Sequence, residues 1–218
     1  MTRLAELTWP EVDAGCLLVI PLGSTEQHGP HLPLSTDTDI AVSLAEALAA
    51  RQLDAVVAPP VSYGASGEHA DFPGTLSIGQ AVLELLLVEL VRSADLTCSR
   101  VLLLNGHGGN TQAVRRAAAL LVDEGRDVRV WSPTWRGDAH AGRTETSVQL
   151  ALGARVGPAR PCGVITPLGE LLPELERCGV RAVSATGVLG DATGASAADG
   201  SALLAAALED LVSFVEQW

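Results

Sequence analysis

Four short apolar runs, separated by segments with helical periodicity, constrain the fold of this chain most strongly. The runs cover residues 16–22, 55–61, 100–104 and 128–132. Because they are almost continuous in Val, Leu and Ile rather than alternating, they are typical of strands buried on both faces of a parallel sheet. Helical patterns cover residues 38–51, 77–94, 111–124, 144–152, 168–177 and 197–216. This alternation predicts an α/β fold with a mostly parallel sheet and helices on both faces.

Short polar residues mark where three of these helices begin. Asp37 or Thr38 can cap the first helix, and Ser77 the second. Ser196 together with Asp199 forms a capping-box signal for the last helix.

The length and charge of the chain restrict its partners. Its 218 residues predict a single domain over residues 1–218. The 14 basic residues are all Arg and stand against 26 acidic residues, which gives a formal net charge of −12. We expect no nucleic-acid partner, because such a surface repels phosphates, whereas it tolerates or attracts metal cations.

Membrane and export signals are weak in the sequence. No apolar run reaches the roughly 18 residues of a membrane helix, and the N-terminal stretch lacks the apolar centre of a signal peptide. The four cysteines are scattered, which argues against a zinc ribbon or a disulfide framework and favours the reducing cytoplasm. We expect Cys16 and Cys98 to be small buried hydrophobic residues.

All five histidines lie in segments that follow the predicted strands. The segments are residues 23–37, 63–75, 105–110 and 135–147. The histidines are His28, His31, His69, His107 and His140. Because ligands bind outside the carboxyl ends of parallel strands, we expect these side chains to meet at one edge of the sheet.

Carboxylates in the same segments make a metal centre the natural interpretation. The candidate ligands are Glu26, His28, Asp37, His107 and Glu145. Imidazole and carboxylate together suit zinc, manganese or ferrous iron, whereas calcium prefers oxygen ligands alone. Five such ligands exceed what one catalytic ion takes from protein. If one carboxylate bridges, they match two divalent ions about 3.5 to 4 Å apart.

Taken singly, each of these pieces has a simpler structural explanation. A lone histidine at a strand end is commonly a hydrogen-bonded core residue, and Glu26 or Asp37 alone could be a helix cap or a solvated charge. Residues 105–110, Asn-Gly-His-Gly-Gly-Asn, could cradle a phosphate, but they lack the glycine spacing and the lysine of known phosphate loops. Because four segments contain such residues together, a metal site is favoured over separate structural roles. His31 fits a substrate contact and a turn-stabilising role equally well.

Residues 23–33, GSTEQHGPHLP, followed by Thr36 and Asp37, resemble the signature of the creatininase family of metal-dependent amidohydrolases. Later motifs of that family are similar to segments that occur here in the same order. They are residues 72–75 (FPGT), 105–110 (NGHGGN), 140–147 (HAGRTETS) and 187–191 (GVLGD). The resemblance therefore covers nearly the whole chain. It implies a three-layer α/β/α sandwich that assembles into homo-oligomers, often hexamers.

The resemblance also implies residue roles. Metal ligands of the family correspond to Glu26, His28, Asp37 and His107, with Asp37 bridging two ions, and its catalytic histidine corresponds to His140. Creatininase itself has a glutamate ligand two residues after the third-motif histidine, where this chain has Gly109. We expect Glu145 to replace it as a ligand and to serve in catalysis. Arg143 stands where many relatives carry an acid, and both departures argue against creatinine as the substrate.

Within the family, the short length and the Arg-only, Ala-rich composition resemble the branch of peptidases that acts in mycofactocin biosynthesis. That implies metal-assisted hydrolysis near the C-terminus of a modified precursor peptide, releasing a Val-Tyr-derived core. His140 would pass a proton to the leaving nitrogen, and Arg143 would pair with a substrate carboxylate. The other residues expected to contact substrate are His31, Glu68, His69 and Trp135.

Two other functions stay open. One is a small-molecule amidohydrolase that opens a cyclic amide or deformylates a pyrimidine nucleotide, although a phosphate-bearing substrate needs several arginines and only Arg136 and Arg143 lie in motif segments. The other is a catalytically silent metal-binding assembly subunit, against which the complete ligand set argues. Residues 68–69 could belong to a loop at a subunit interface instead of contacting substrate. Trp135 could be a buried aromatic anchor of the fold.

Overall fold

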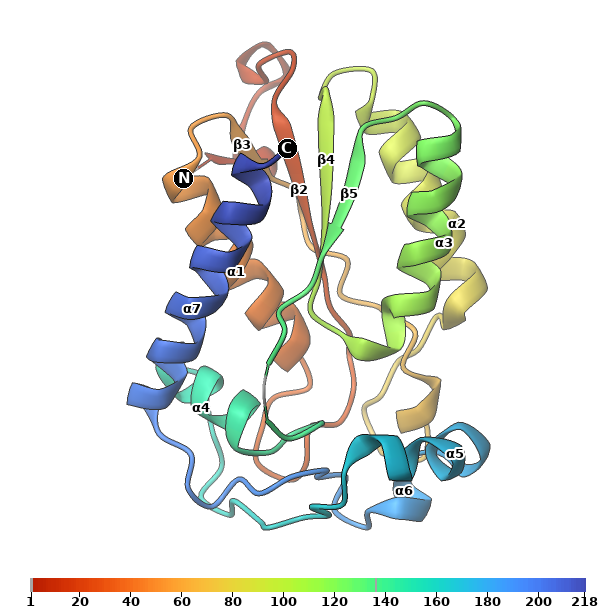
Figure 1. Cartoon of the computed structure of the whole chain (residues 1–218), viewed down its shortest axis with the longest axis vertical. Helices are drawn as coiled ribbons and strands as arrows, with labels where there is room; N and C mark the ends of the chain where they lie inside the picture. The colour runs from red at the N-terminus through yellow and green to blue at the C-terminus, as the bar shows by residue number, and fades with distance from the viewer. Residues whose placement is uncertain (1, 136) are drawn as a thin grey trace.

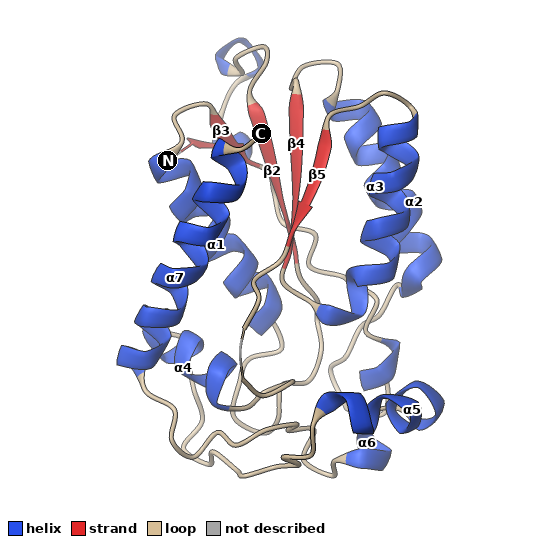
Figure 2. Ribbon diagram, in the orientation of Figure 1, coloured by secondary structure: helices blue, strands red, loops and turns tan. Residues whose placement is uncertain are grey.

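The structure, a computed structural model, describes residues 2–135 and 137–218 and contains one parallel five-stranded sheet. The strand order is β1-β3-β2-β4-β5, and every neighbouring pair is parallel (Figures 1 and 2). The strands are β1 (Thr2–Arg3), β2 (Leu17–Leu22), β3 (Ala55–Val57), β4 (Arg100–Asn105) and β5 (Val128–Trp131). The predicted parallel sheet is therefore confirmed.

Helices cover both faces of this sheet. They are α1 (Thr36–Arg51), α2 (Gly79–Ala94), α3 (Thr111–Asp123), α4 (Arg143–Ala151), α5 (Leu168–Cys178), α6 (Val180–Val183) and α7 (Ala197–Glu216). Figure 1 shows α2 and α3 on one face and α1 and α7 on the other, which is the expected three-layer arrangement. Among the described residues, no helix is both long and apolar enough to cross a membrane.

The central strand β2 explains why the apolar runs in the sequence are continuous. All six of its residues are buried. Leu18, Ile20 and Leu22 pack in the core beneath α2 and α3, whereas Leu17 and Val19 pack beneath α1 and α7. Both faces of the strand thus bury apolar side chains, and burying each one contributes about 1.5–3 kcal/mol relative to exposure.

The boundaries of the elements differ from the predictions where local chemistry intervenes. Strand β3 ends at Val57 rather than at residue 61, because Pro59 and Pro60 follow and have no N–H for a strand ladder. Strand β1 and helix α6 were not predicted. Cys16 and Cys98 are buried, as expected.

The caps of the helices were predicted with mixed success. The Ser196 side chain accepts a hydrogen bond from the Asp199 N–H at 3.1 Å, so the cap of α7 is confirmed. Neither Asp37 nor Thr38 caps α1, because the N-cap is Ser35 and both residues lie inside the first turn. Ile78 is the N-cap of α2, but the Ser77 hydroxyl accepts from the Gly79 N–H at 3.2 Å.

The loops after β2, β3 and β4 are joined at the carboxyl edge of the sheet. Asn110, which ends the 3₁₀ helix η4 (Gly108–Asn110), donates to the Gly23 carbonyl at 2.9 Å and accepts from the Ala65 N–H at 2.8 Å. This fully buried amide holds the three loops at fixed positions. Beyond the same edge lie α4, α5 and α6 (Figure 1).

Candidate metal centre

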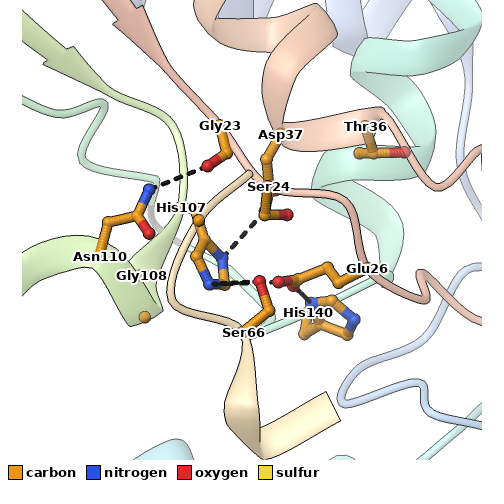
Figure 3. Close-up of polar contacts among 12 residues, drawn as sticks. Gly23, Ser24, Glu26, Thr36, Asp37, Ser66, His107, Gly108, Asn110 and His140 are labelled. Carbon is orange, nitrogen blue, oxygen red and sulfur yellow. Dashed lines mark hydrogen bonds and ion pairs between the residues drawn. The ribbon is translucent and has the colours of Figure 1, made fainter. Parts of the chain in front are cut away.

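The carboxyl edge of the sheet gathers side chains from separate segments. They are Glu26, His28 and His31 after β2, Asp37 in the first turn of α1, His69 in the 3₁₀ helix η3 (Gly67–His69), His107 after β4, and His140 and Glu145 around the start of α4. All five histidines are buried, with at most 8% of each exposed. Figure 3 shows Asp37 and Glu26 at the two nitrogens of the His107 ring, with His140 beside Glu26. The prediction that the histidines lie together at one edge of the sheet is confirmed.

Asp37 lies between two histidines. Its Oδ1 is 3.1 Å from His28 Nε2, and its Oδ2 is 2.9 Å from His107 Nδ1. The Ser24 hydroxyl also donates to Oδ2 at 2.7 Å. Burial alone would raise the pKa of Asp37, but the charges and hydrogen bonds of the two histidines hold it well below its usual range. Asp37 is therefore an anion within this buried centre.

Glu26 is the least satisfied polar group of the centre. Its side chain is fully buried, and within residues 2–135 and 137–218 neither of its carboxylate oxygens has a hydrogen-bond partner. Three imidazole nitrogens lie close: His107 Nε2 at 3.1 Å, His69 Nε2 at 3.2 Å and His140 Nδ1 at 3.8 Å. Burial raises the pKa of Glu26 to about 7. Buried oxygens are rarely left unpaired, so this carboxylate fits a cation.

The histidines of the centre present ring nitrogens in the manner of metal ligands. The Nδ1–H of His28 faces the Glu26 carbonyl at 3.2 Å, and the Nδ1–H of His107 faces the Asp37 carboxylate. In His28, Nε2 is then the nitrogen that can bind a metal once its proton is lost, since the second N–H of a ligating imidazole is usually held by a carbonyl or carboxylate. His107 has a carboxylate at each nitrogen, Asp37 at Nδ1 and Glu26 at Nε2. Three groups bring ligand atoms within 4.8 Å of one another: Glu26–His28–His140, Glu26–Asp37–His107 and His28–Asp37–Glu145. This donor set fits divalent metal ions.

Protons compete with metal for these nitrogens. Burial opposes the charged form, but Asp37, Glu145 and Glu26 overcome it and raise the pKa of His28 to about 10. Likewise, Glu26 and Asp37 overcome burial and raise the pKa of His107 to about 9. Without metal, both rings are therefore protonated at neutral pH.

Gln27 organises the other two histidines of the centre. Its Nε2 lies 2.8 Å from His69 Nδ1 and 3.2 Å from the Gly187 carbonyl, so its two N–H groups can donate to both. His69 then carries its proton on Nε2, towards Glu26. His140 Nε2–H donates to the Gln27 carbonyl at 2.9 Å, which leaves Nδ1 of His140 as the free acceptor facing Glu26. Burial lowers the pKa of His69 to about 3 and that of His140 well below its usual value.

Comparison with known proteins identifies the family of this fold and centre. The family model named Creatininase, described as creatinine amidohydrolase, matches residues 5–215. The chain belongs to the creatininase family. A mycofactocin precursor peptide peptidase of Mycolicibacterium smegmatis is 50% identical over 211 residues, 93% of this chain and 85% of that protein. A creatinine amidohydrolase of Pseudomonas putida is 32% identical over 132 residues, 56% of this chain and 50% of that protein.

Solved structures of the family share the fold. A crystal structure of creatinine amidohydrolase matches with a TM-score of 0.81 and 26% identity over 99% of this chain and 97% of that one. A mutant creatininase described as Zn-Zn type matches with a TM-score of 0.81 and 25% identity, again over 99% and 97%. The three-layer fold implied by the sequence motifs is confirmed.

A cleft of about 1490 Å³ opens beside the centre of this creatininase-family chain. Trp135, Arg143 and Glu145 line it, together with His107. The side chain of Arg143 forms an ion pair with Asp199, which also lines the cleft, at 2.7 Å. Of the two arginines noted in the sequence motifs, Arg136 lies outside the described residues.

The remaining predicted contact residues lie in or behind the centre rather than along the cleft. His31 is buried, and its Nε2 lies 2.9 Å from the Thr146 hydroxyl in α4. That contact joins the loop after β2 to α4. His69 is buried against Glu26. Glu68 Oε1 lies 3.7 Å from His107 Nε2, and its side chain is 33% exposed.

Glu145 occupies the position that the sequence motifs suggested. Its Oε2 accepts a hydrogen bond from the Ala141 N–H at 2.6 Å and lies 3.9 Å from His28 Nε2. Burial raises its pKa. Thus the carboxylate reaches the centre from the first turn of α4.

Two residues that organise the centre were missed in the sequence. Gln27 stands between two predicted ligands, and its position in that motif was the only available signal. Asp138 accepts hydrogen bonds from the N–H and hydroxyl of Thr144, at 3.1 and 2.9 Å, and from the Arg143 N–H, so it fixes the start of α4 and with it Glu145. An aspartate five residues before a helix start could have been recognised as a candidate cap.

Proposed function

We propose that this chain is a metal-dependent peptidase that hydrolyses a peptide bond near the C-terminus of the mycofactocin precursor peptide. The observation that carries the proposal is the buried, unpartnered Glu26 carboxylate, surrounded by histidines and Asp37 beside a large cleft. The peptide as substrate is supported by relatives about 50% identical that have the name mycofactocin precursor peptide peptidase.

We assign the ligands of two divalent ions from the groups of converging donors. One ion would be held by His28, Asp37 and Glu145, and the other by Glu26, Asp37 and His107. Asp37 is common to both groups and would bridge. When bound, such ions polarise a scissile carbonyl and make a water acidic enough to attack it at neutral pH. Zinc, manganese and iron all suit these donors, and solved family members are described as Zn-Zn type and Mn.

His140 moves the proton in this scheme. Its Nε2–H is bonded to the Gln27 carbonyl, so only Nδ1 is free to take a proton from the attacking water. Because burial keeps His140 neutral, that nitrogen is ready to accept. The imidazolium then returns the proton to the leaving amide nitrogen, which completes cleavage of the C–N bond.

Gln27 and His69 hold the ligand Glu26 in position. His69 is neutral, with its Nδ1 accepting from the Gln27 amide and its Nε2 3.2 Å from Glu26 Oε1. This contact limits the orientations of Glu26 while substrate enters and product leaves. Such supporting contacts typically change metal affinity or activity by about 10- to 100-fold when removed.

The cleft offers both charge and apolar surface to a peptide. Trp135 and Leu203 supply apolar surface, and Arg143 stands with its partner Asp199 on the wall. A substrate carboxylate would have to compete with Asp199 for the Arg143 guanidinium. We further propose a homo-oligomer, on the family resemblance, and a cytoplasmic location, with which the four free cysteines agree.

Mass spectrometry of peptide products tests the function. The purified protein, loaded with zinc, should release a C-terminal dipeptide from a peptide ending in Val-Tyr. The Glu26→Gln variant should lose this activity. The matched control Glu84→Gln, which changes a surface carboxylate paired with Arg116, should keep it.

The same assay includes the alternative family activity. Turnover of creatinine or another cyclic amide, with no peptide cleaved, would replace the peptidase by a small-molecule amidohydrolase. No turnover of either substrate class by metal-loaded protein would favour the silent assembly subunit.

A further inference from the structure

The structure leaves no room for a side chain at position 109. A Cβ atom on Gly109 would lie 2.4 Å from His107 Nε2, 2.4 Å from the Ala65 carbonyl oxygen and 2.5 Å from Glu68 Oε1. Real Cβ contacts are not this short. The space that a side chain at 109 would fill is thus occupied by the His107 ring, the Ala65 carbonyl and the Glu68 carboxylate from the η3 helix.

The Glu68 carboxylate faces the metal centre without another charged partner. Within residues 2–135 and 137–218, His107 is the one basic side chain within 4.0 Å of it. Arg181, from the neighbouring α6, instead donates to the Asp71 carbonyl at 3.0 Å. A carboxylate that served only the fold would more often be paired or fully solvated.

Two carboxylate oxygens lie near His107 Nε2. Glu26 Oε2 lies 3.1 Å from this nitrogen, and Glu68 Oε1 lies 3.7 Å from it. Donors arranged tetrahedrally at about 2.0–2.2 Å from a zinc ion stand roughly 3.4 Å apart. Glu68 is in none of the three groups whose donors all lie within 4.8 Å of one another, so its side chain has to turn towards Glu26 to share an ion with it. The other nitrogen of this ring, Nδ1, lies 2.9 Å from Asp37, so Nε2 is the nitrogen that faces Glu26 and Glu68. Glu26, the second donor, is fully buried and has neither oxygen hydrogen-bonded among the described residues.

We propose that Glu68 is a ligand of the ion held by Glu26 and His107, and that it supplies a carboxylate beside His107 where position 109 has no room for a side chain. The inference rests on the metal centre of the proposed function, not on its substrate. It gives that ion three unshared protein ligands. It also brings four carboxylates, Glu26, Asp37, Glu68 and Glu145, to two divalent ions, so the charges balance.

Zinc binding to chelator-stripped protein tests the proposal without any substrate. Competition with a chromophoric chelator would give the stoichiometry and the affinity of each site. We expect two equivalents in the natural protein. Glu68→Gln should weaken one of the two sites by at least about 10-fold and leave the other unchanged. Asp71→Asn is the matched control, because it removes the same charge from the same exposed loop and should bind as the natural protein does.

The outcomes separate the ligand from a general charge effect. Two zinc sites of natural affinity in Glu68→Gln would overturn the proposal, as would equal weakening in Glu68→Gln and Asp71→Asn. Glu68→Asp, which keeps the charge but shortens the side chain, should bind with intermediate affinity. A protein that binds zinc as expected but cleaves no peptide would refute the proposed function and leave this inference standing.

Discussion

Gly106 fixes the distance between strand β4 and the start of α1, so adding one methyl group there tests the geometry of the centre. A Cβ on Gly106 would lie 2.6 Å from the Asp37 carbonyl oxygen and 3.2 Å from the Ala41 Cβ. Both neighbours belong to α1 and cannot rotate away. To restore an ordinary contact of about 3.4 Å, the first turn of α1 must move by about 0.8 Å.

That shift has a cost in both stability and activity. Overpacking of this kind typically destabilises by about 1–3 kcal/mol. Because Asp37 belongs to two of the three candidate ligand groups, its displacement should disturb both of the proposed ion sites. A misplacement near 1 Å can cost about 100-fold in rate. We therefore expect Gly106→Ala to lower the free energy of unfolding by about 1–3 kcal/mol. It should also lower kcat/KM by about 10- to 100-fold.

Gly108→Ala is the matched control, two residues along the same loop. A Cβ there meets nothing within 4 Å, so its effect on unfolding should stay within about 0.5 kcal/mol. Urea denaturation gives the stabilities, and peptide cleavage gives kcat/KM. If the two variants prove equally stable and equally active, the close approach of β4 and α1 does not set the position of Asp37.

Three further predictions concern the metal-free protein and its thiols. Chelation should lower the free energy of unfolding, by about 4 kcal/mol for each ion previously at 1,000 times its Kd, measured by urea denaturation with and without zinc; unchanged stability would contradict the metal centre. In the metal-free folded protein, the pKa values of His28 and His107 are about 10 and about 9, above the ordinary 6.5. The folded state therefore binds more protons than the unfolded state, and stability should fall as the pH rises from 6.5 to 10. A rise in stability over that range would refute the raised pKa values of these two histidines. A thiol reagent should label exposed Cys162 rapidly, whereas Cys98, whose pKa burial raises to about 12, should react only on unfolding; fast labelling of Cys98 in native protein would show that its site opens.

The fold was largely predictable because its signals are strong and local. Strands buried on both faces leave continuous apolar runs, and α7 was predicted with its observed bounds from periodicity and the Ser196 cap. Strand β1, with two residues, and α6, with four, are too short to show any period. They exist because tertiary contacts select them.

The candidate centre was predictable in its members but not in its connections. Parallel strands bring their carboxyl ends to one edge, so the location of five histidines followed from topology. The roles of Gln27 could not, because its side chain contacts His69 and His140, which are 42 and 113 residues away in sequence. Likewise, the relation between Gly109 and Glu68 appears only when the two loops are placed together.

The buried carboxylates connect the acidity of the chain to its chemistry. Glu26, Asp37 and Glu145 lie within a water-poor centre. Burial raises the pKa of Glu26 and of Glu145, and the nearby histidines and Asp37 act on it in opposite directions. Without metal, His28 and His107 are protonated and pair with these carboxylates, but withdrawing so many charges from water still costs several kcal/mol per ion. When divalent ions bind, this free-energy cost is offset, since each carboxylate then stabilises the bound metal. Without metal, these buried side chains therefore lower the stability of the protein, and with metal bound they raise it. Loss of metal should then also destabilise this edge of the sheet.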